Sequence, residues 1–391
     1  MHKTTTPRSL SALDTIPVFE LDYDLPPAER WEMLPKRQRN RGRKLMEKVL
    51  EMTPNSLVAG ASGKILRLTT MARNPFRAEI EGAARVLGAG FDDALVTNFI
   101  IEFTTIGLYT GSLAQKSANS FAPIADGLSG IFENLRGWSR ACTAGVMHSD
   151  HLGMLHLRAL DWPLPGIGET TILLHHVNTP GGDYYSVGWP GYCGVLSGFK
   201  PGAFSASINQ TFLFGRPSLQ WPPSHLLRRV FDECETYDEA LDALSHSSVC
   251  VPAMILLSSA DRAAAVEMTP KGNRVHPMEN GRPIAVANDY LSADWREEFH
   301  ATYPDFAAYL EDQTESVDPA EPAVDMDGRR NALLERMNRR NPRTPAQAFK
   351  ILQNAPVEYN LTMQQMVYSH EKDELLIVGR EYEKPVCALQ L

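Results

Sequence analysis

The sequence predicts an α+β protein in which helices cover β-sheets. The chain has 391 residues, of which 43% are hydrophobic and 22% charged, a globular composition with enough length to bury a substantial core. Apolar residues recur at helical spacing through most of the first 140 residues, whereas short apolar runs bounded by turn residues follow from Cys142 onwards. Strands, then a helical stretch, then strands again are typical of sheets with helices packed on them.

Helical patterns dominate the first part of the chain. LPPAERWEML (25–34) begins with prolines suited to a first helical turn, and FRAEIEGAARVLG (76–88) has helical apolar spacing and ends at glycine. FDDALVTNFIIEF (91–103) continues the same pattern. We therefore expect a mostly helical layer before residue 141.

Strand patterns begin at CTAGVMH (142–148). The other predicted strands are MLHLRALDW, TTILLHHV, YYSVGW, GVLSGF and AFSASIN, the last two joined by a Lys-Pro-Gly turn, followed later by VPAMILLS and AAAVEMT. One helix is predicted over 224–246, starting at the cap-like Ser224, and another from about Arg329. The chain should end in a hairpin formed by NLTMQQMVYSH and ELLIVGREY.

The segment 107–141 lies between the helical layer and the first strand. Its first half is rich in Gly, Ser and Ala, whereas FAPIADGLSGIFENLRGW has an amphipathic helical pattern. We interpret it as an insertion packed against the domain; a lid and a membrane-touching helix are the alternatives.

Charge and apolar runs exclude several classes of protein. The net charge of −9 argues against a general nucleic-acid binder, whose phosphate contacts need a basic face. The basic run KRQRNRGRK (36–44) is interpreted as a solvated helix face, with an anionic membrane surface or a nuclear signal as alternatives. No apolar window is long enough to span a bilayer and no secretory signal is visible, so the sequence predicts a soluble cytoplasmic protein, lysosomal or secreted only if a signal has been removed.

Neither a metal site nor a disulfide framework is predicted. The five cysteines are scattered without a CxxC pair, and His148, His151, His175 and His176 have no accompanying carboxylate set. We expect no cofactor.

Cys142 stands close to two charged residues in the predicted hairpin. A hairpin centred near Asp150 would put Cys142 directly across from Arg158, on the same face of the sheet. A guanidinium beside a thiol favours the thiolate and so predicts a lowered pKa. Asp161 would face the other way by strand alternation, so the strand must bulge or end near Leu160 if both charges are to reach Cys142.

Several ordered motifs give the chain a family resemblance. They are TIPVFELDYDLPPAERW, CTAGV, LRALDW, GYCGVLSGFKPGAFSASIN, ANDY and DGRR, spread from about Thr15 to the terminal hairpin. In these motifs the chain resembles the acid ceramidases and N-acylethanolamine-hydrolysing acid amidases. This family belongs to the N-terminal-nucleophile hydrolases and is related to the choloylglycine hydrolases.

The resemblance implies an αββα sandwich, in which two antiparallel sheets pack face to face between helices, and a precursor that cuts itself. The scissile bond would be Ala141–Cys142, so that residues 1–141 become a small subunit and residues 142–391 a catalytic large subunit. Because residues 1–141 contain no cysteine, apolar packing of the N-terminal helices would hold the two subunits together. The freed α-amine of Cys142 would serve as base for its own thiol, because its unperturbed pKa of about 8 is close to neutrality. Relatives lack the insertion at 107–141, which makes the efficiency of the cut an open question.

The resemblance also implies roles for particular residues. Arg158 would flank the nucleophile, Asp161 would align the amine and the substrate amide, and Asn288 would help to stabilise the oxyanion. Arg329 would organise the site. Asn209 and Gln210 would contact substrate, and Gln210 stands where relatives have a glutamate, so a permanently neutral amide replaces a titratable group.

The expected activity is hydrolysis of a linear fatty-acyl amide, of the ceramide or acylethanolamine type, through a thioester at Cys142. The acyl chain would lie in an apolar groove bordered by the N-terminal segment, and a lipid substrate implies peripheral membrane contact. One alternative is an N-acyltransferase or amide synthase that uses the same thioester. The other is an uncleaved lipid-binding protein without activity.

Overall fold

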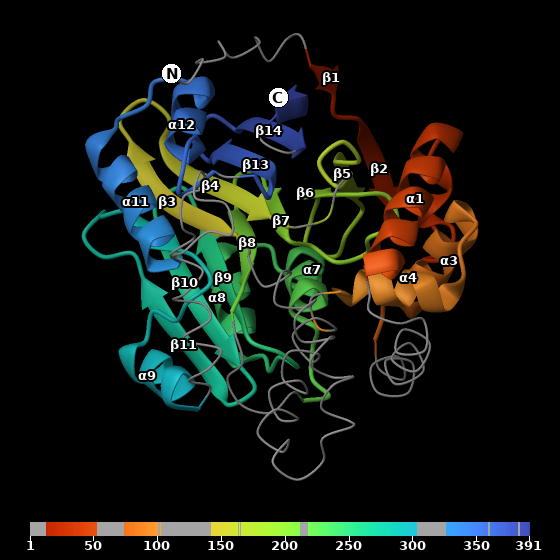
Figure 1. Cartoon of the computed structure of the whole chain (residues 1–391), viewed down its shortest axis with the longest axis horizontal. Helices are drawn as coiled ribbons and strands as arrows, with labels where there is room; N and C mark the ends of the chain where they lie inside the picture. Colours follow the sequence, from red (N-terminus) through yellow and green to blue (C-terminus); the bar gives the residue numbers. More distant parts are fainter. Residues whose placement is uncertain are drawn as a thin grey trace.

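The computed structural model describes residues 13–52, 74–100, 102, 142–162, 164, 166–211, 218–302, 326–358, 360–381 and 384–391. The predicted insertion at 107–141 lies outside these ranges. The described ranges can be followed from red to blue in Figure 1. None of the helices within the described ranges is both long and apolar enough to cross a membrane.

The strands of the described residues form two sheets. Sheet A has the order β1-β15-β14-β13-β4-β3-β12. Its strands are β1 (Asp14–Thr15), β3 (Thr143–Ser149), β4 (Gly153–Asp161), β12 (Ile284–Val286), β13 (Thr362–Ser369), β14 (Glu374–Glu381) and β15 (Lys384–Gln390). Sheet B has the order β11-β10-β9-β8-β7-β6-β5-β2. Its strands are β2 (Val18–Asp22), β5 (Ile172–Val177), β6 (Tyr184–Gly188), β7 (Ser197–Lys200), β8 (Phe204–Gln210), β9 (Ala253–Ser258), β10 (Ala263–Thr269) and β11 (Gly272–Pro277).

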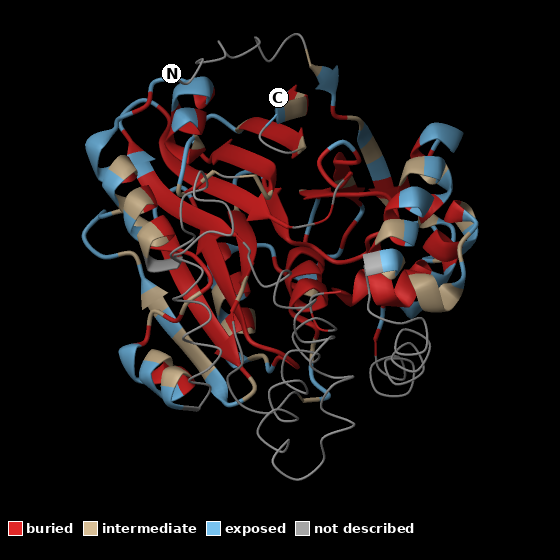
Figure 2. Cartoon of the chain, in the orientation of Figure 1, coloured by how far each residue is buried: buried red, intermediate tan, exposed pale blue. Residues whose placement is uncertain are grey.

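Helices cover the outer face of each sheet (Figure 1). Helices α7 (Pro223–Glu233) and α8 (Tyr237–His246) pack on sheet B, and α11 (Met326–Arg339) and α12 (Pro345–Leu352) pack on sheet A. The inner faces of the two sheets meet in apolar layers, such as the one formed by Leu173, Val187, Phe199, Met366, Tyr368 and Ile377. The predicted αββα arrangement is confirmed, and Figure 2 shows that most of its strands are buried.

Several sequence predictions need correction. The sheets are not wholly antiparallel, because β2 pairs with β5 and β1 with β15 in parallel. The helix predicted over 224–246 is two helices: Cys234 has extended backbone, and Thr236 starts α8 with a capping box to Glu239. The first part of the chain is not only helical, since β1 and β2 precede the short 3₁₀ turn η2 (Arg30–Met33).

The N-terminal segment closes one edge of each sheet. β1 is the edge strand beside β15 in sheet A, and β2 is the edge strand beside β5 in sheet B. Helices α1 (Lys36–Met52), α3 (Arg77–Leu87) and α4 (Phe91–Asn98) follow and form the red and orange group at the right of Figure 1. The basic run of the sequence lies in α1, as predicted, and its Arg43 and Lys44 are exposed.

A buried charge network joins this segment to the rest of the chain. The Arg228 guanidinium of α7 donates two hydrogen bonds of 2.7 Å to the Glu79 carboxylate of α3. Both side chains are fully buried, and Glu79 also accepts from the Trp31 indole at 3.0 Å. Tyr23 adds a second link by donating to Asp232 at 2.5 Å. The segment is therefore attached by ion pairing as well as by the apolar packing that the sequence predicted.

The lysine of the GFKPG motif has a structural role. The buried Lys200 ammonium donates to the carbonyl oxygens of Gly181 (2.6 Å), Phe231 (2.9 Å) and Cys234 (2.6 Å). Two of these carbonyls lie at the end of α7, where a helix has unsatisfied acceptors and a negative dipole end. Lys200 thus fixes α7 on sheet B.

A polar cluster of histidines and serines lies between the sheets. His156 of β4 contacts Ser205 (2.9 Å) and Ser258 (3.1 Å) through Nδ1, and Ser207 (2.9 Å) through Nε2. His370 contacts the same Ser205 hydroxyl at 2.9 Å. Burial, with His370 and Arg158 nearby, lowers the pKa of His156 to about 3, and burial lowers that of His370 to about 4. Both imidazoles are therefore neutral at physiological pH.

Glu79→Gln should destabilise the protein by about 3 kcal/mol or more, because Arg228 would lose the nearer of its two carboxylate partners, Glu79 and Asp232. The measurement is the free energy of unfolding in urea. Glu81→Gln, in the same helix, is the matched control: its exposed pair with Arg77 should contribute less than about 0.5 kcal/mol. Equal stabilities of the two variants would contradict the prediction.

The buried histidines should make the fold sensitive to acid. A folded pKa near 4 lies below the unfolded value of about 6.5, so stability that is full above pH 6.5 is lost as the pH falls towards 4. For His370 the loss is on the order of 3 kcal/mol. Glu102 acts in the opposite direction, since burial raises its pKa to about 8, so the test must compare variants.

His370→Gln should flatten the dependence of unfolding free energy on pH between 7 and 4. The exposed His246 offers the control, because His246→Gln should leave that slope as it is in the wild type. A His370→Gln profile parallel to that of the wild type would rule out the buried imidazole as a source of the acid sensitivity.

Candidate active site

Cys142 stands immediately before β3 and is the first residue of the described range 142–162. It is 4% exposed and has a φ of 71°, in the left-handed region that non-glycine residues rarely adopt. Such a conformation costs a non-glycine residue about 1 kcal/mol. The backbone at the predicted scissile bond is therefore strained.

The sulfur of Cys142 meets the predicted arginine. Arg158 Nη2 donates to Cys142 Sγ at 3.0 Å, and Arg158 is itself 1% exposed. The predicted pairing of β3 with β4 is wrong, however. The turn between these strands is centred on His151 and not on Asp150, so Arg158 pairs with Ala144 and not with Cys142. The long guanidinium reaches the sulfur diagonally, from two residues along the same face.

The predicted lowering of the Cys142 pKa is also wrong in the chain as described. Burial raises the pKa of the thiol, and the opposing effect of Arg158 does not cancel it. The thiol is consequently protonated at neutral pH and needs a base before it can act as a nucleophile.

Asp161 binds the nitrogen of the same residue. Its Oδ2 accepts a 3.1 Å hydrogen bond from the Cys142 backbone N–H, and its Oδ1 accepts from the Thr362 hydroxyl at 2.6 Å. β4 ends at Asp161, where its register with β13 shifts between Thr362 and Gln364. The expected break in the strand near Leu160 is confirmed, and it lets Arg158 and Asp161 approach different atoms of Cys142.

Arg329 supplies the positive charge beside that carboxylate. Its Nη2 donates to Asp161 Oδ2, its Nε donates to the Pro356 carbonyl at 3.1 Å, and both charged side chains are fully buried. Because a buried carboxylate is costly without a counter-charge, the buried Arg329 offsets the cost of placing Asp161 beneath Cys142. The position agrees with the organising role predicted for Arg329.

Asn209 connects the arginine with the backbone of the site. Its Oδ1 accepts from Arg158 Nη1 at 2.6 Å, and its Nδ2 donates to the carbonyl oxygens of Cys142 (3.2 Å) and Ala287 (2.8 Å). The residue is fully buried. Both polar atoms of Asn209 are engaged by protein groups here, whereas the sequence predicted contact with substrate.

Asn288 and Gln210 lie beside Asn209 and its hydrogen-bond partners. The Asn288 side-chain amide donates to the Gln210 carbonyl at 2.6 Å, and an amide carries a second N–H, which is the group that the oxyanion prediction needs. Gln210 is half-buried at the end of β8, and strand alternation points its side chain to the face opposite Asn209. Asn288 is therefore tied to the backbone at the end of β8.

Sequence reasoning missed Thr362 as a neighbour of the site. It follows a loop and begins the predicted terminal hairpin, where a threonine is an ordinary strand residue. Its contact with Asp161 depends on the register shift between β13 and β4, which no local pattern encodes.

The surroundings of Cys142 are apolar and partly aromatic. Its core cluster includes Trp162, Trp189 and Tyr192, of which Trp189 stacks on Tyr192 with ring centroids 4.7 Å apart. The N-terminal segment contributes to the same cluster through Leu45, Val49, Val96 and Ile100. Residues from both parts of the chain therefore belong to the apolar cluster that contains Cys142.

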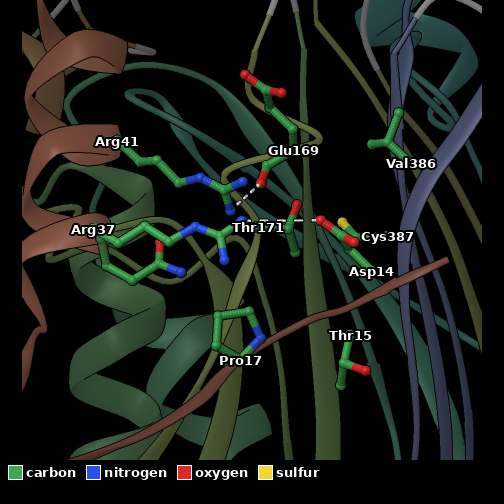
Figure 3. A pocket seen from close by; sticks show the side chains of 10 residues that line it. Asp14, Thr15, Pro17, Arg37, Arg41, Glu169, Thr171, Val386 and Cys387 are labelled. Atoms are coloured by element: carbon green, nitrogen blue, oxygen red, sulfur yellow. Dashed lines mark hydrogen bonds and ion pairs between the residues drawn. The ribbon is translucent and has the colours of Figure 1, made fainter.

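A polar cavity of about 330 Å³ lies elsewhere, between β1, α1 and β15 (Figure 3). Arg37 and Arg41 reach into it from α1 (Figure 3). Arg41 donates to the Glu169 carbonyl at 3.2 Å, and Arg37 lies 4.0 Å from the Asp14 carboxylate. The charges of the cavity are thus partly compensated by the protein, and it shares no lining residue with the Cys142 cluster. The described residues contain no group of three or more His, Cys, Asp or Glu that could hold a metal ion.

Similar solved structures are distant in sequence. An N-acylethanolamine-hydrolyzing acid amidase ortholog from Caenorhabditis elegans is 20% identical, with a TM-score of 0.45 over 59% of this chain and 93% of that chain. Penicillin V acylase from Agrobacterium tumefaciens is 15% identical, with a TM-score of 0.44 over 64% of this chain and 86% of that chain.

Sequence relatives are found among curated proteins, although no family model matches the chain. Mouse acid ceramidase is 24% identical over 262 residues, covering 62% of this chain, and human acid ceramidase is 24% identical over 269 residues. The matched region spans 60% of the length of each of these relatives. These matches confirm the predicted resemblance: the chain is similar in sequence to the acid ceramidases.

Proposed function

We propose that the protein is a cysteine amidase that hydrolyses a fatty-acyl amide through a thioester at Cys142. The observation that carries the proposal is the separate binding of the two reactive atoms of Cys142. Arg158 donates to the sulfur at 3.0 Å, while Asp161 accepts from the nitrogen at 3.1 Å. A nucleophile and a base in one residue need such separate orientation.

The nitrogen becomes a base only when the Ala141–Cys142 bond is cut. In the uncut chain it is a peptide nitrogen without basicity. Attack of the Cys142 sulfur on the preceding carbonyl carbon would give a thioester by an N-to-S acyl shift, and water would hydrolyse it. The left-handed backbone at Cys142 supports this step, because cleavage releases the constraint on φ.

The amidase reaction then uses the freed amine. It takes the thiol proton, the sulfur bonds to the amide carbon, and the carbonyl electrons move to the oxygen, which Asn288 would stabilise. Collapse of this intermediate breaks the C–N bond, and the ammonium group returns the proton to the leaving amine. Water adds to the thioester, releases the fatty acid and regenerates the thiol.

The raised pKa of the Cys142 thiol supports a mechanism with a base. A thiol that stays protonated at neutral pH cannot rely on spontaneous ionisation. Ceramide is a fatty-acyl amide, so the similarity to acid ceramidases, together with the apolar cluster around Cys142, favours a fatty-acyl amide substrate over a peptide.

The proposal is tested by incubating the purified chain with a series of acyl amides and measuring free fatty acid. Adding an acceptor amine separates hydrolysis from acyl transfer, because transfer would divert the acyl group from free acid to a new amide. Absence of both products for every acyl amide, with fully cut protein, would remove the amidase proposal.

Purified protein should contain two fragments, one ending at Ala141 and one starting at Cys142. Cys142→Ala should stay a single, inactive chain, since it loses the nucleophile for both reactions. Intact mass and denaturing electrophoresis measure this. All five cysteines lie at or after residue 142 and none is in a disulfide, so non-reducing gels should separate the fragments equally well. A fully active single chain would contradict the mechanism.

Activity should peak nearer neutral pH than in relatives with a glutamate at the position of Gln210. Although the Gln210 side chain points away from Asn209, the residue adjoins the site through its carbonyl contact with Asn288. A carboxylate placed there would ionise as the pH rises and oppose, through space, negative charge at the thiolate and oxyanion, whereas the amide does not titrate. Gln210→Glu should therefore shift the profile of kcat/KM towards acid. The measurement uses fully cut enzyme and one soluble fluorogenic acyl amide from about pH 4 to 9.

Gln347→Glu is the matched control for this shift, because it adds the same charge at an exposed position of α12. Its profile should superimpose on that of the wild type. If Gln210→Glu superimposes as well, the residue has no part in the pH dependence.

A further inference from the structure

Glu267 is a fully buried carboxylate that the proposed reaction leaves unexplained. It lies on β10 and shares a strand face with Ala263 and Ala265, which pack towards sheet A. Burial raises its pKa, but hydrogen bonds from His276 and Ser292 outweigh that effect, so the pKa is lower than usual. The group is therefore an anion in the space between the sheets.

Four donors surround this carboxylate. His276 Nε2 lies 2.7 Å from Oε2, the backbone N–H groups of Leu291 and Ser292 donate to Oε1 at 2.5 and 3.1 Å, and the Ser292 hydroxyl donates to Oε2. Three of the four donors come from the residues just before α9 (Ala293–Thr302). Glu267 thus fastens the start of α9 to sheet B.

The same loop carries Asn288 at its other end. Asn209 donates to the Val286 and Ala287 carbonyls, and Asn288 donates to the Gln210 carbonyl. The loop 287–292 is therefore fixed beside Cys142 at one end and on Glu267 at the other. Helix α9 is tied further to β11, which lies beside it in Figure 1, by the pair of Arg274 with Asp294.

The cluster is not a second catalytic triad. A Ser-His-acid triad needs the carboxylate at one imidazole nitrogen and the hydroxyl at the other. Here the Glu267 carboxylate and the Ser292 hydroxyl both lie at Nε2 of His276, the hydroxyl at 3.3 Å, and the hydroxyl donates to the carboxylate. The arrangement holds the loop and does not prepare a nucleophile.

We propose that Glu267, supported by His276, is a positioning residue that sets the place of Asn288 in the active site. The inference rests on the proposed function, in which Asn288 stabilises the oxyanion. Such donors act only at the correct distance, and a misplacement of about 1 Å can lower a rate about 100-fold. Glutamine at this position would turn an N–H towards donors and release one end of the loop.

The first measurement is steady-state kinetics of the cut enzyme. Glu267→Gln should lower kcat about 10- to 100-fold and change KM less than about threefold, because the oxyanion is formed only after substrate binds. His276→Ala should lower kcat, and His276→Gln, which retains an N–H donor, should lower it less. Glu81→Gln is the matched control, since it makes the same change at an exposed glutamate of α3, away from the loop, and should leave kcat unchanged.

The second measurement needs no substrate. Backbone hydrogen exchange of the segment 287–292 should rise at least about tenfold in Glu267→Gln, with β3 and β4 unchanged. The positioning role would be overturned if the segment exchanged at the wild-type rate in Glu267→Gln. It would also be overturned if exchange were faster in that variant while kcat stayed unaltered. If the wild type hydrolyses no acyl amide, the proposed function fails, and exchange alone decides whether Glu267 holds the loop.

Discussion

The site depends on one buried carboxylate, that of Asp161. Its two oxygens join the backbone nitrogen of Cys142, the hydroxyl of Thr362 and the guanidinium of Arg329, and so connect β3, β4, β13 and α11. An anion in this position would be very costly without the buried arginine. The sandwich is thus arranged so that one outer helix neutralises the charge on which the inner strands converge.

Much of this arrangement follows from local sequence patterns. The strands from Cys142 to Asn209 are continuous apolar runs between turn residues, and the structure has a strand in each. Arg158 and Asp161 could be placed near Cys142 because a hairpin brings neighbouring strands together. The one-position error in register arose because the turn residues Ser149 to Leu152 allow more than one centre, and only the packed sheet selects between them.

The remaining features depend on contacts between distant segments. β11 (GNRVHP) is an exposed polar edge strand, so it has no apolar pattern to detect. β2 pairs in parallel with β5, more than 150 residues later, and no turn signals such a pairing. The direction of the Cys142 pKa shift was also inaccessible, because it reflects complete burial, which a single charged neighbour does not reveal.

The placement of the N-terminal segment affects how the protein folds and whether it can refold after unfolding. β1 and β2 complete both sheets, and Glu79 neutralises the buried Arg228. While the chain is intact, these pieces find each other at the high effective concentration of one molecule. If the bond before Cys142 is cut as proposed, reassembly would be a bimolecular reaction between a helical fragment and a fragment with two open sheet edges, which are prone to aggregate. The processed enzyme would then persist by the slowness of its unfolding and not by its ability to refold.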